Sequence, residues 1–380
     1  MKFKFSTSPN YQNPRTIQMI MRDLTIGLLI VYAFALIKYF NLGSAYGIHV
    51  ILMLLLAEVT SFAIELIYYK IFKATLKQTI KEYINTSFPW ITPLILVLMC
   101  PANATYYAIF ISTMVAVVFA KMLFGGFGQN IFNPAAVGRA IFFTVATNTT
   151  ANLVTGATPT ASFASFGWVM NFQTFEEFIG NYHGLLNMFV GNYYGALGET
   201  SALVMIIIGI FLSVRKVIDW HVPVVYLATI FVGSSIIALN HGMGIYYPIF
   251  NLLTGGAVFG AVFMLTDPVT NPTTRAGRVL FALLAGVITL LIRVKANLPE
   301  GVLYSILIVN MFVPVIDDVF AGNQLDKKAS YIKTIVITAV VSVLIIFAVS
   351  TSLDAKEGTM PETASTNVSL LVNNGGVTNE

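Results

Sequence analysis

Long apolar stretches separated by short polar segments run through most of the chain. A helix needs about 20 mostly apolar residues to cross the hydrocarbon core of a bilayer. Stretches of this kind, some slightly shorter, predict ten membrane-spanning helices: 24–40, 47–69, 105–124, 132–147, 201–212, 222–239, 249–265, 279–294, 302–316 and 332–349. A further run, 91–100, has Pro89, Pro93 and Pro101 within or beside it and predicts a short or re-entrant helix, or else a poor eleventh span, so that the count is ten, give or take one. The pattern therefore predicts an all-α polytopic membrane protein with about ten transmembrane helices, some of them broken or half-length.

Composition places most of the protein's surface in lipid. Hydrophobic residues make up 57% of the 380 residues and charged residues 10%, against roughly 45–50% and about 25% in an ordinary soluble domain. The net charge of +4 is too small and too dispersed for a nucleic-acid-binding surface. Cys100 is the single cysteine, whereas an iron–sulfur cluster usually takes four thiolates. Any redox chemistry would therefore come from an organic cofactor or from a partner protein.

The basic residues predict the orientation in the membrane. They lie before the first span and in four of the later connections: Lys2, Lys4, Arg15, Arg22, Lys70, Lys73, Lys77, Lys81, Arg215, Lys216, Arg275, Arg278, Lys327 and Lys328. All of them fall on one side if the N-terminus is cytoplasmic, since cytoplasmic loops carry an excess of Lys and Arg. The loop 148–198 contains no Lys or Arg and is predicted to be external.

These signals divide the chain into five parts. We expect a cytoplasmic N-terminal segment (1–23), a first transmembrane half (24–147), an external loop (148–198), a second transmembrane half (199–350) and a disordered polar tail (351–380).

Two similar corners suggest an internal duplication. The sequence Asn-Pro, followed by Gly-Arg, occurs within residues 133–139 and again within residues 271–278. Transporters often contain duplicated halves with sites at broken helices, but Asn-Pro is also a common turn signal. A glycine-rich corner at 124–130 leads into the first of these. It is typical either of a cavity lined for an ion or cofactor or of a tight turn between closely packed helices.

Four carboxylates lie inside or at the ends of predicted spans, where a charge is costly and usually functional. Glu58 and Glu65 are seven residues apart on one face of the second span, Glu199 precedes a span, and Asp267 ends one. They are candidates for an ion pathway. The alternative is that each is an internal ion-pair partner or an interfacial residue.

The external loop contains the segment Thr155-Gly156-Ala157-Thr158-Pro159. The small neighbours leave the Thr158 hydroxyl sterically open, and Pro159 favours an extended backbone at Thr158. Such a hydroxyl is a candidate for covalent modification, although loops of this composition are common.

Several motifs occur in a fixed order: FGGFGQNIFNPAAVGRA at 124–140, TGATP at 155–159, GETS at 198–201, GG at 255–256, FMLTDPVTNPT at 263–273 and PEG at 299–301. Taken together, over about residues 16–349, the chain resembles the RnfD/NqrB family of flavin-bearing membrane subunits of ion-pumping oxidoreductases. Because the first span begins early, it is most similar to the D subunit of the Rnf complex.

The resemblance implies that FMN is joined through its phosphate to Thr158, the last residue of a motif that also includes Thr155, Gly156 and Ala157. It implies attachment by a flavin transferase outside a bacterial cytoplasmic membrane, and iron–sulfur and flavin subunits as partners. A second, noncovalent flavin such as riboflavin is also consistent with it. The family's attachment motif commonly begins with an acidic residue where this chain has Asn152.

The predicted function is therefore that of a membrane flavoprotein subunit of a Na⁺- or H⁺-translocating ferredoxin:NAD⁺ oxidoreductase. One alternative is an NqrB-type subunit of a Na⁺-pumping NADH:quinone oxidoreductase. The alternative from another class is a small-solute transporter or channel with no redox role.

Overall fold

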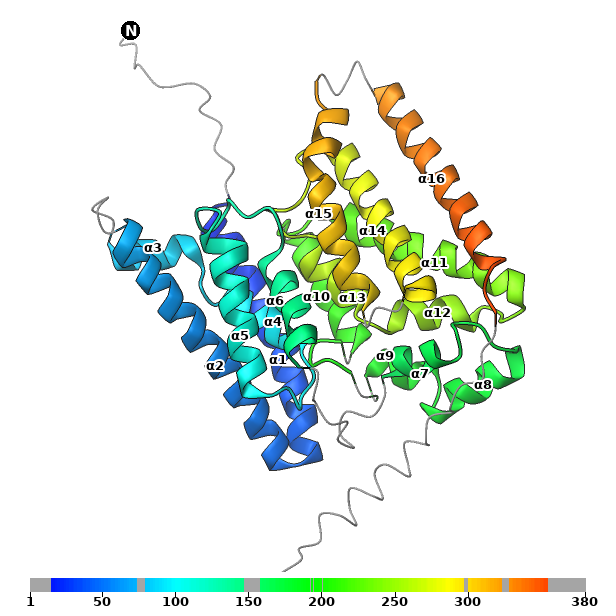
Figure 1. Cartoon of the computed structure of the whole chain (residues 1–380), viewed down its shortest axis with the longest axis horizontal. Helices are drawn as coiled ribbons and strands as arrows, with labels where there is room; N and C mark the ends of the chain where they lie inside the picture. Colours follow the sequence, from blue (N-terminus) through cyan, green and yellow to red (C-terminus); the bar gives the residue numbers. More distant parts are fainter. Residues whose placement is uncertain are drawn as a thin grey trace, which may run out of the picture.

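The computed structural model describes residues 15–73, 79–146, 158–191, 193, 195–199, 201–296, 300–322 and 328–354. These residues are mostly helical, and their only β-type pairing is an isolated bridge between Pro101 and Ala196. The all-α prediction is therefore confirmed. Figure 1 shows α1–α6 gathered on one side of the molecule and α11–α16 on the other.

The helices follow one another in the order α1 (Ile17–Leu42), α2 (Ser44–Tyr68), α3 (Ile80–Ser87), α4 (Ile91–Met99), α5 (Tyr106–Val117), α6 (Pro134–Val145), α7 (Pro159–Ser165), α8 (Phe172–Asn181), α9 (Leu185–Val190), α10 (Ala202–Val214), α11 (His221–His241), α12 (Tyr246–Leu253), α13 (Ala257–Phe259), α14 (Arg275–Lys295), α15 (Gly301–Val319) and α16 (Lys328–Ser350). Three π-helical segments extend α2, α5 and α13: η1 (Tyr69–Lys73), η3 (Val118–Met122) and η5 (Gly260–Met264).

Nine of the ten predicted spans each coincide with one helix or with a helix and its π-helical extension. Six helices are long and apolar enough to cross a membrane: α1, α2 with η1, α11, α14, α15 and α16. Three shorter apolar helices are α5 with η3, α6 and α10. The predicted span 249–265 differs from a simple helix, because α12 and the following α13–η5 segment meet at a 60° bend. The run 91–100 forms the short helix α4.

The first helix begins at Ile17, seven residues before the predicted start of the span. The Thr16 hydroxyl accepts a hydrogen bond from the Met19 amide (3.3 Å) and caps the helix. The carboxylate of Asp23 is buried, and Arg215 (2.9 Å) and Arg22 (3.4 Å) pair with it. Because the charge of Asp23 is paired, the helix can include polar residues that hydropathy alone would leave out of the span.

Two opposite faces of the helical bundle are distinguished by their contacts. On the first, which we call the cationic face, Arg215 pairs with Asp23 and Arg278 pairs with Asp219 (2.9 Å). Burial alone would raise the pKa of Asp219, but hydrogen bonds from His221 and Arg278 outweigh burial and hold this pKa below its ordinary value.

The second face carries the described part of the segment 158–199, and we call it the loop face. Here Lys38 donates hydrogen bonds to the carbonyl oxygens of Gly191 (2.5 Å) and Tyr193 (2.6 Å). Lys38 follows Asp23 by 15 residues on the same helix α1, which corresponds to a rise of roughly 22 Å. The two faces therefore lie at opposite ends of one long helix.

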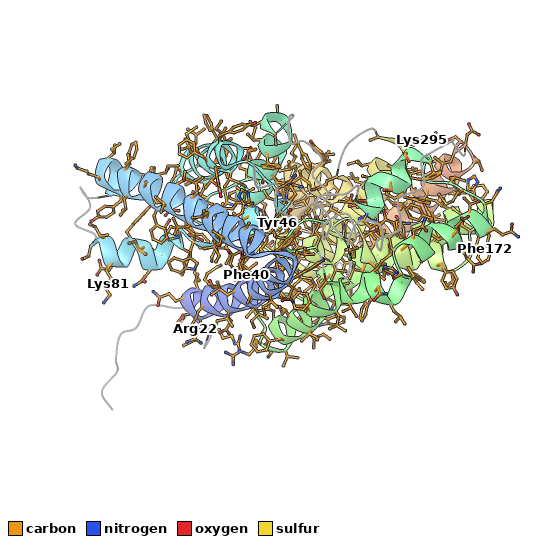
Figure 2. The ribbon with its side chains drawn as sticks, turned by 90° about the horizontal axis from the view of Figure 1, so that it is seen from below. Arg22, Phe40, Tyr46, Lys81, Phe172 and Lys295 are labelled. Atoms are coloured by element: carbon orange, nitrogen blue, oxygen red, sulfur yellow. The ribbon has the colours of Figure 1, made fainter. Side chains whose placement is uncertain are left out.

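The turn between α1 and α2 lies at the loop-face end of the bundle. Gly47 packs directly on the ring of Phe40, and a Cβ atom at this position would come within 2.5 Å of that ring. Figure 2 shows Phe40 and Tyr46 at this turn, while Lys81 and Phe172 lie toward opposite ends of the molecule. The missing side chain of Gly47 is what allows two long apolar helices to meet so closely.

The segment predicted as an external loop contains three short helices, α7, α8 and α9, which lie beside α12 at one end of the molecule (Figure 1). Their aromatic side chains form a buried cluster with α12, as described below. The prediction of a disordered tail at 351–380 falls largely outside the described residues. Of the described part, Leu353 is buried against the helices.

The two Asn-Pro corners share one structural feature and differ in another. Each follows a π-helix, η3 in the first half and η5 in the second. Asn133 caps α6 by accepting hydrogen bonds from two backbone amides, whereas Thr274 caps α14 and Asn271 donates to the carbonyl of Leu265 (2.7 Å). The internal similarity is therefore local and partial.

Candidate functional site

Thr158 is the one residue of the predicted attachment segment that the structure describes; Thr155, Gly156 and Ala157 lie outside the described residues. Its backbone is extended (φ −58°, ψ 151°), as Pro159 predicts. Its hydroxyl oxygen caps α7 by accepting from the Ala161 amide (3.2 Å) and lies 3.0 Å from the Thr160 hydroxyl. The residue is half-buried.

Helix α7 is held on an aromatic platform. Phe163, which is fully buried, contacts the rings of Trp168, Phe175, Phe178, Tyr247 and Phe250, with ring centroids 5.3–5.8 Å apart. Tyr182 adds a hydrogen bond to the Ser162 hydroxyl (3.1 Å). These contacts join the loop segment to α12 and fix the position of Thr158 at the loop face.

The first turn of α7 touches the break between α12 and α13. Gly255 has a positive φ of 64°, and a Cβ atom there would lie 2.9 Å from the Thr160 methyl group and 2.8 Å from Arg293 Nη2. Arg293 donates to the carbonyl oxygens of Asn251 (2.7 Å), Thr254 (3.0 Å) and Gly255 (3.1 Å). A buried guanidinium thus satisfies the carbonyl groups that the end of a helix leaves without partners.

Glu199 lies on the other side of the same break. A Cβ atom on Gly256 would clash with its carboxylate, so a side chain there would have to displace Glu199 from this position. Glu199 also lies within Coulombic range of Arg139, Arg293 and Glu300, and Arg139 forms an ion pair with Glu300. The structure therefore places this predicted ion-pathway residue in a network of charges around a broken helix.

Glu65 and Glu58 have different surroundings although they share a helix. Glu65 is 2% exposed, and its Oε1 lies 2.5 Å from Lys121 Nζ. Its other oxygen accepts a hydrogen bond from the Ser87 hydroxyl. Glu58 is half-buried, and its Oε2 is buried without a hydrogen-bond partner. The two carboxylates are separated by seven residues, or roughly 10 Å along the helix.

Asp267 lines a small cavity between the two corners. The cavity has a volume of about 60 Å³ and is lined mostly by apolar residues, together with Lys121, Asn130, Asn133, Thr266 and Asp267. A volume of this size holds a few water molecules. The Asp267 carboxylate accepts hydrogen bonds from the Val269 amide (3.2 Å) and the Thr270 hydroxyl (3.3 Å). Of the cationic side chains that the structure describes, none lies within 4 Å of it.

The glycine corner borders this cavity through Phe127 and Asn130. Gly125, Gly126 and Gly128 all have positive φ angles, between 88° and 111°. Other L-residues rarely adopt this backbone. The corner therefore forms a turn that glycine makes possible and contributes two residues to the lining of a cavity; the role of that cavity stays a prediction.

Three buried cations are central to these sites, and the sequence pattern alone did not single them out. Lys121, Arg139 and Arg293 each lie inside a predicted span and are at most 5% exposed. The signal was present, because a cation within an apolar span normally needs a partner or a function. No group of three or more His, Cys, Asp or Glu side chains suited to a metal occurs among the described residues.

Known proteins resemble this chain over most of its length. The model of the NQR2, RnfD, RnfE family matches residues 4–325. The D subunit of the proton-translocating ferredoxin:NAD(+) oxidoreductase complex of Clostridium ljungdahlii is 33% identical over 328 residues, which cover 83% of this chain and 93% of that protein. The Na(+)-translocating counterpart of Acetobacterium woodii is 30% identical, with 82% and 92% covered. The D subunit of the ion-translocating oxidoreductase complex of Salmonella arizonae is 29% identical, with 83% and 96% covered.

The family model and these relatives both extend through the two corners, the loop segment and the broken helix described above. The resemblance recognised from the motifs is thus confirmed. The chain belongs to the NQR2, RnfD, RnfE family.

Proposed function

We propose that this chain is the D subunit of an Rnf-type, ion-translocating ferredoxin:NAD⁺ oxidoreductase and carries FMN on Thr158. The observation that carries the proposal is the half-buried Thr158 hydroxyl, which follows the TGA sequence and caps α7 on a rigid platform. The names of the relatives, two of which are ferredoxin:NAD(+) oxidoreductase subunits, support the choice of complex.

The residues around Thr158 fit an ester link. A phosphoester replaces the hydroxyl proton on Oγ1, while the lone pair that accepts from the Ala161 amide stays available. The cap of α7 therefore survives the modification. Bound FMN would supply one-electron chemistry that side chains lack. The aromatic platform under Phe163 would hold its attachment point in one place.

The same architecture suggests how the attachment site communicates with the membrane part. Thr160 lies two residues after Thr158, in the first turn of α7, and contacts the break at Gly255, where Arg293 and Glu199 are also located. A displacement of α7 would therefore act directly on the junction of two half-helices. In this proposal the electrons move on the loop side, and the broken helix couples them to ion movement.

The four carboxylates contribute unequally to a proposed ion path. Glu65 is already neutralised by Lys121, and Glu199 belongs to the charge network at the break. Glu58 and Asp267 have no cationic partner within 4 Å among the described side chains. They are therefore the better candidates for groups that bind a transported Na⁺ or H⁺.

The chain is also proposed to bind a second, noncovalent flavin. The cavity between the two corners is too small to be its binding site. Its volume of about 60 Å³ is well below the roughly 300–1,000 Å³ of ordinary ligand pockets. A tricyclic ring would have to displace lining side chains, so we assign no role in electron transfer to this cavity.

The proposal places the chain in a bacterial cytoplasmic membrane with the loop face outward. It requires a flavin transferase on that side and iron–sulfur and flavin subunits as electron partners. Many side chains exposed on the spans are large and apolar, Ile337, Val340 and Leu344 of α16 among them, and these suit lipid or partner helices.

The test is the covalent adduct itself. The complex is produced together with the host's flavin transferase, and the denatured subunit is examined for in-gel flavin fluorescence. Chymotryptic cleavage after Phe143 and Phe163 should release a peptide whose mass includes FMN, with fragmentation locating it on Thr158. Thr158→Ala should abolish the fluorescence, whereas the matched variant Thr160→Ala should keep it. Fluorescence of the Thr158→Ala protein would overturn the assignment.

Two alternatives have their own outcomes. A wild-type protein that carries no flavin in the presence of the transferase would favour a solute transporter or channel. Flavin attachment together with electron transfer that requires quinone rather than ferredoxin and NAD⁺ would favour the NqrB type.

A further inference from the structure

Lys121 is a fully buried cation inside an apolar helical segment. It lies in the π-helix η3 and is 2% exposed. Its ammonium group donates to Glu65 Oε1 (2.5 Å) and to the Ser87 carbonyl oxygen (2.7 Å). An ammonium has three donors, and the described residues offer no third acceptor at hydrogen-bond distance. π-helical turns within helices occur frequently at functional sites.

The same side chain lines the cavity that Asp267 borders. Lys121 thus pairs with one carboxylate, Glu65, and lines the same cavity as a second one, Asp267. Asn130 and Asn133, from the first corner, also line the cavity, and the side-chain amide of Asn130 donates to the Phe132 carbonyl (3.1 Å). A hydrogen bond from Asn133 Nδ2 to the Met264 carbonyl (3.4 Å) ties that corner to η5 of the second half.

The charged residues lining this cavity are Lys121 and Asp267, and Glu65 joins them through its pair with Lys121. When both carboxylates are ionised, Glu65 and Asp267 contribute two negative charges, and Lys121 contributes one positive charge. A net charge of −1 remains, in a part of the protein where an uncompensated charge is costly. One monovalent cation would restore neutrality, whereas a divalent cation would exceed it. The long, flexible stem of lysine allows its ammonium to move between neighbouring acceptors.

We propose that Lys121 is a tethered cation that competes with the transported monovalent cation for the oxygen atoms of this cavity. With Lys121 on Glu65, the arrangement in the structure, the cavity accepts Na⁺ or a proton beside Asp267. When Lys121 turns into the cavity and pairs with Asp267, it displaces that cation, and Ser87 stays beside Glu65. This inference rests on the proposed ion-translocating function. It assigns the release of the transported cation from the cavity to one side chain, Lys121.

A merely structural ion pair makes a different prediction. Removing one partner of a buried pair strands the other charge, so Lys121→Gln or Glu65→Gln alone is expected to impair folding in either case. Replacing both removes the pair without stranding a charge. The double variant Lys121→Gln/Glu65→Gln therefore separates the two roles, since it retains Asp267 and loses only the competitor.

The experiment uses the complete complex, purified and reconstituted in liposomes. Ferredoxin-driven NAD⁺ reduction and ion uptake are measured against Na⁺ at fixed pH, and against pH without Na⁺, so that the two arms identify the cation. The double variant should assemble and bind the cation roughly tenfold more tightly, because the competing state is gone. Its maximal transport rate should fall by a similar factor, because release slows. Lys333→Gln, which removes an exposed lysine of α16, is the matched control and should change neither quantity.

Asp267→Asn provides an independent measurement. It leaves the Lys121–Glu65 pair neutral, so the variant should assemble, and its electron transfer should lose dependence on the cation. The inference is overturned if the double variant keeps the wild-type affinity and rate, or if Asp267→Asn keeps wild-type cation dependence. A wild-type complex whose electron transfer shows no cation dependence and no ion uptake would instead refute the proposed function.

Discussion

Arg215, at the end of α10, lies 2.9 Å from Asp23, near the beginning of α1. Lys38, near the other end of α1, donates to the backbone of the loop segment at Gly191. One helix thus carries a contact to each face, and the described loop segment lies on the face opposite Arg215. Since basic residues mark the cytoplasmic side, this arrangement predicts that α7 is exposed to the outside of the cell.

Cysteine labelling tests this orientation in a Cys100→Ser background. Ser165, exposed at the end of α7, and Ser330, exposed in the first turn of α16, are each replaced by cysteine. In intact cells an impermeant thiol reagent should modify the residue at 165 and leave the one at 330 unmodified until lysis. Labelling of position 330 alone in intact cells would mean that the topology is inverted.

The break between α12 and α13 should tolerate no side chain at Gly256. Its φ is 66°, and a Cβ atom would clash with the Glu199 carboxylate. Gly256→Ala should therefore lower the melting temperature of the detergent-solubilised protein. Gly242→Ala is the control, because Gly242 has a similar φ of 69° but open space around the Cβ position. Its cost should be only that of the left-handed backbone, about 1–2 kcal/mol. Equal losses in the two variants would show that Glu199 does not constrain the break.

The aromatic platform should control whether Thr158 can be modified. Phe163→Ala removes the central ring of the cluster, and truncating a buried Phe costs about 3–5 kcal/mol. We expect α7–α9 to become sensitive to protease and the FMN content to fall, while the transmembrane part stays assembled. Leu186→Ala, at a position 81% exposed in the same segment, should have no effect. Normal flavin content in Phe163→Ala would show that FMN attachment to Thr158 does not depend on an ordered aromatic platform.

Much of the fold follows from hydropathy, because lipid imposes a simple requirement on each span. The ten predicted spans are helical for that reason. Hydropathy failed where charges are paired in space: it began α1 seven residues late, since nothing in the sequence shows that Arg215 will neutralise Asp23. It also missed the helices of the loop segment, whose aromatic residues look unremarkable until α12 completes their core.

The candidate site was only partly predictable for a similar reason. The conformation of Thr158 followed from the proline after it, which is a local effect. The partner of Glu65 did not, because Lys121 is 56 residues away and the pair forms only when α2 packs beside α5. Treating lysines and arginines inside spans as functional candidates, and not only as topology signals, would have brought out Lys121, Arg139 and Arg293.

Glu58 and Glu65 should respond in opposite ways to the same substitution. A carboxylate within a span costs roughly 2.5–3.5 kcal/mol on insertion scales, and the Oε2 atom of Glu58 receives no hydrogen bond. Glu58→Gln removes a charge that no described cation compensates, so assembly and FMN content should be unchanged. If Glu58 binds the transported ion, the substitution should slow ion-coupled turnover.

Glu65→Gln leaves Lys121 buried without its counter-ion, and losing one partner of such a pair costs about 3–5 kcal/mol. That variant should therefore be poorly assembled, as judged by size-exclusion chromatography of the complex. Normal turnover and ion stoichiometry in Glu58→Gln would assign this residue a structural role and leave Asp267 as the candidate ion ligand.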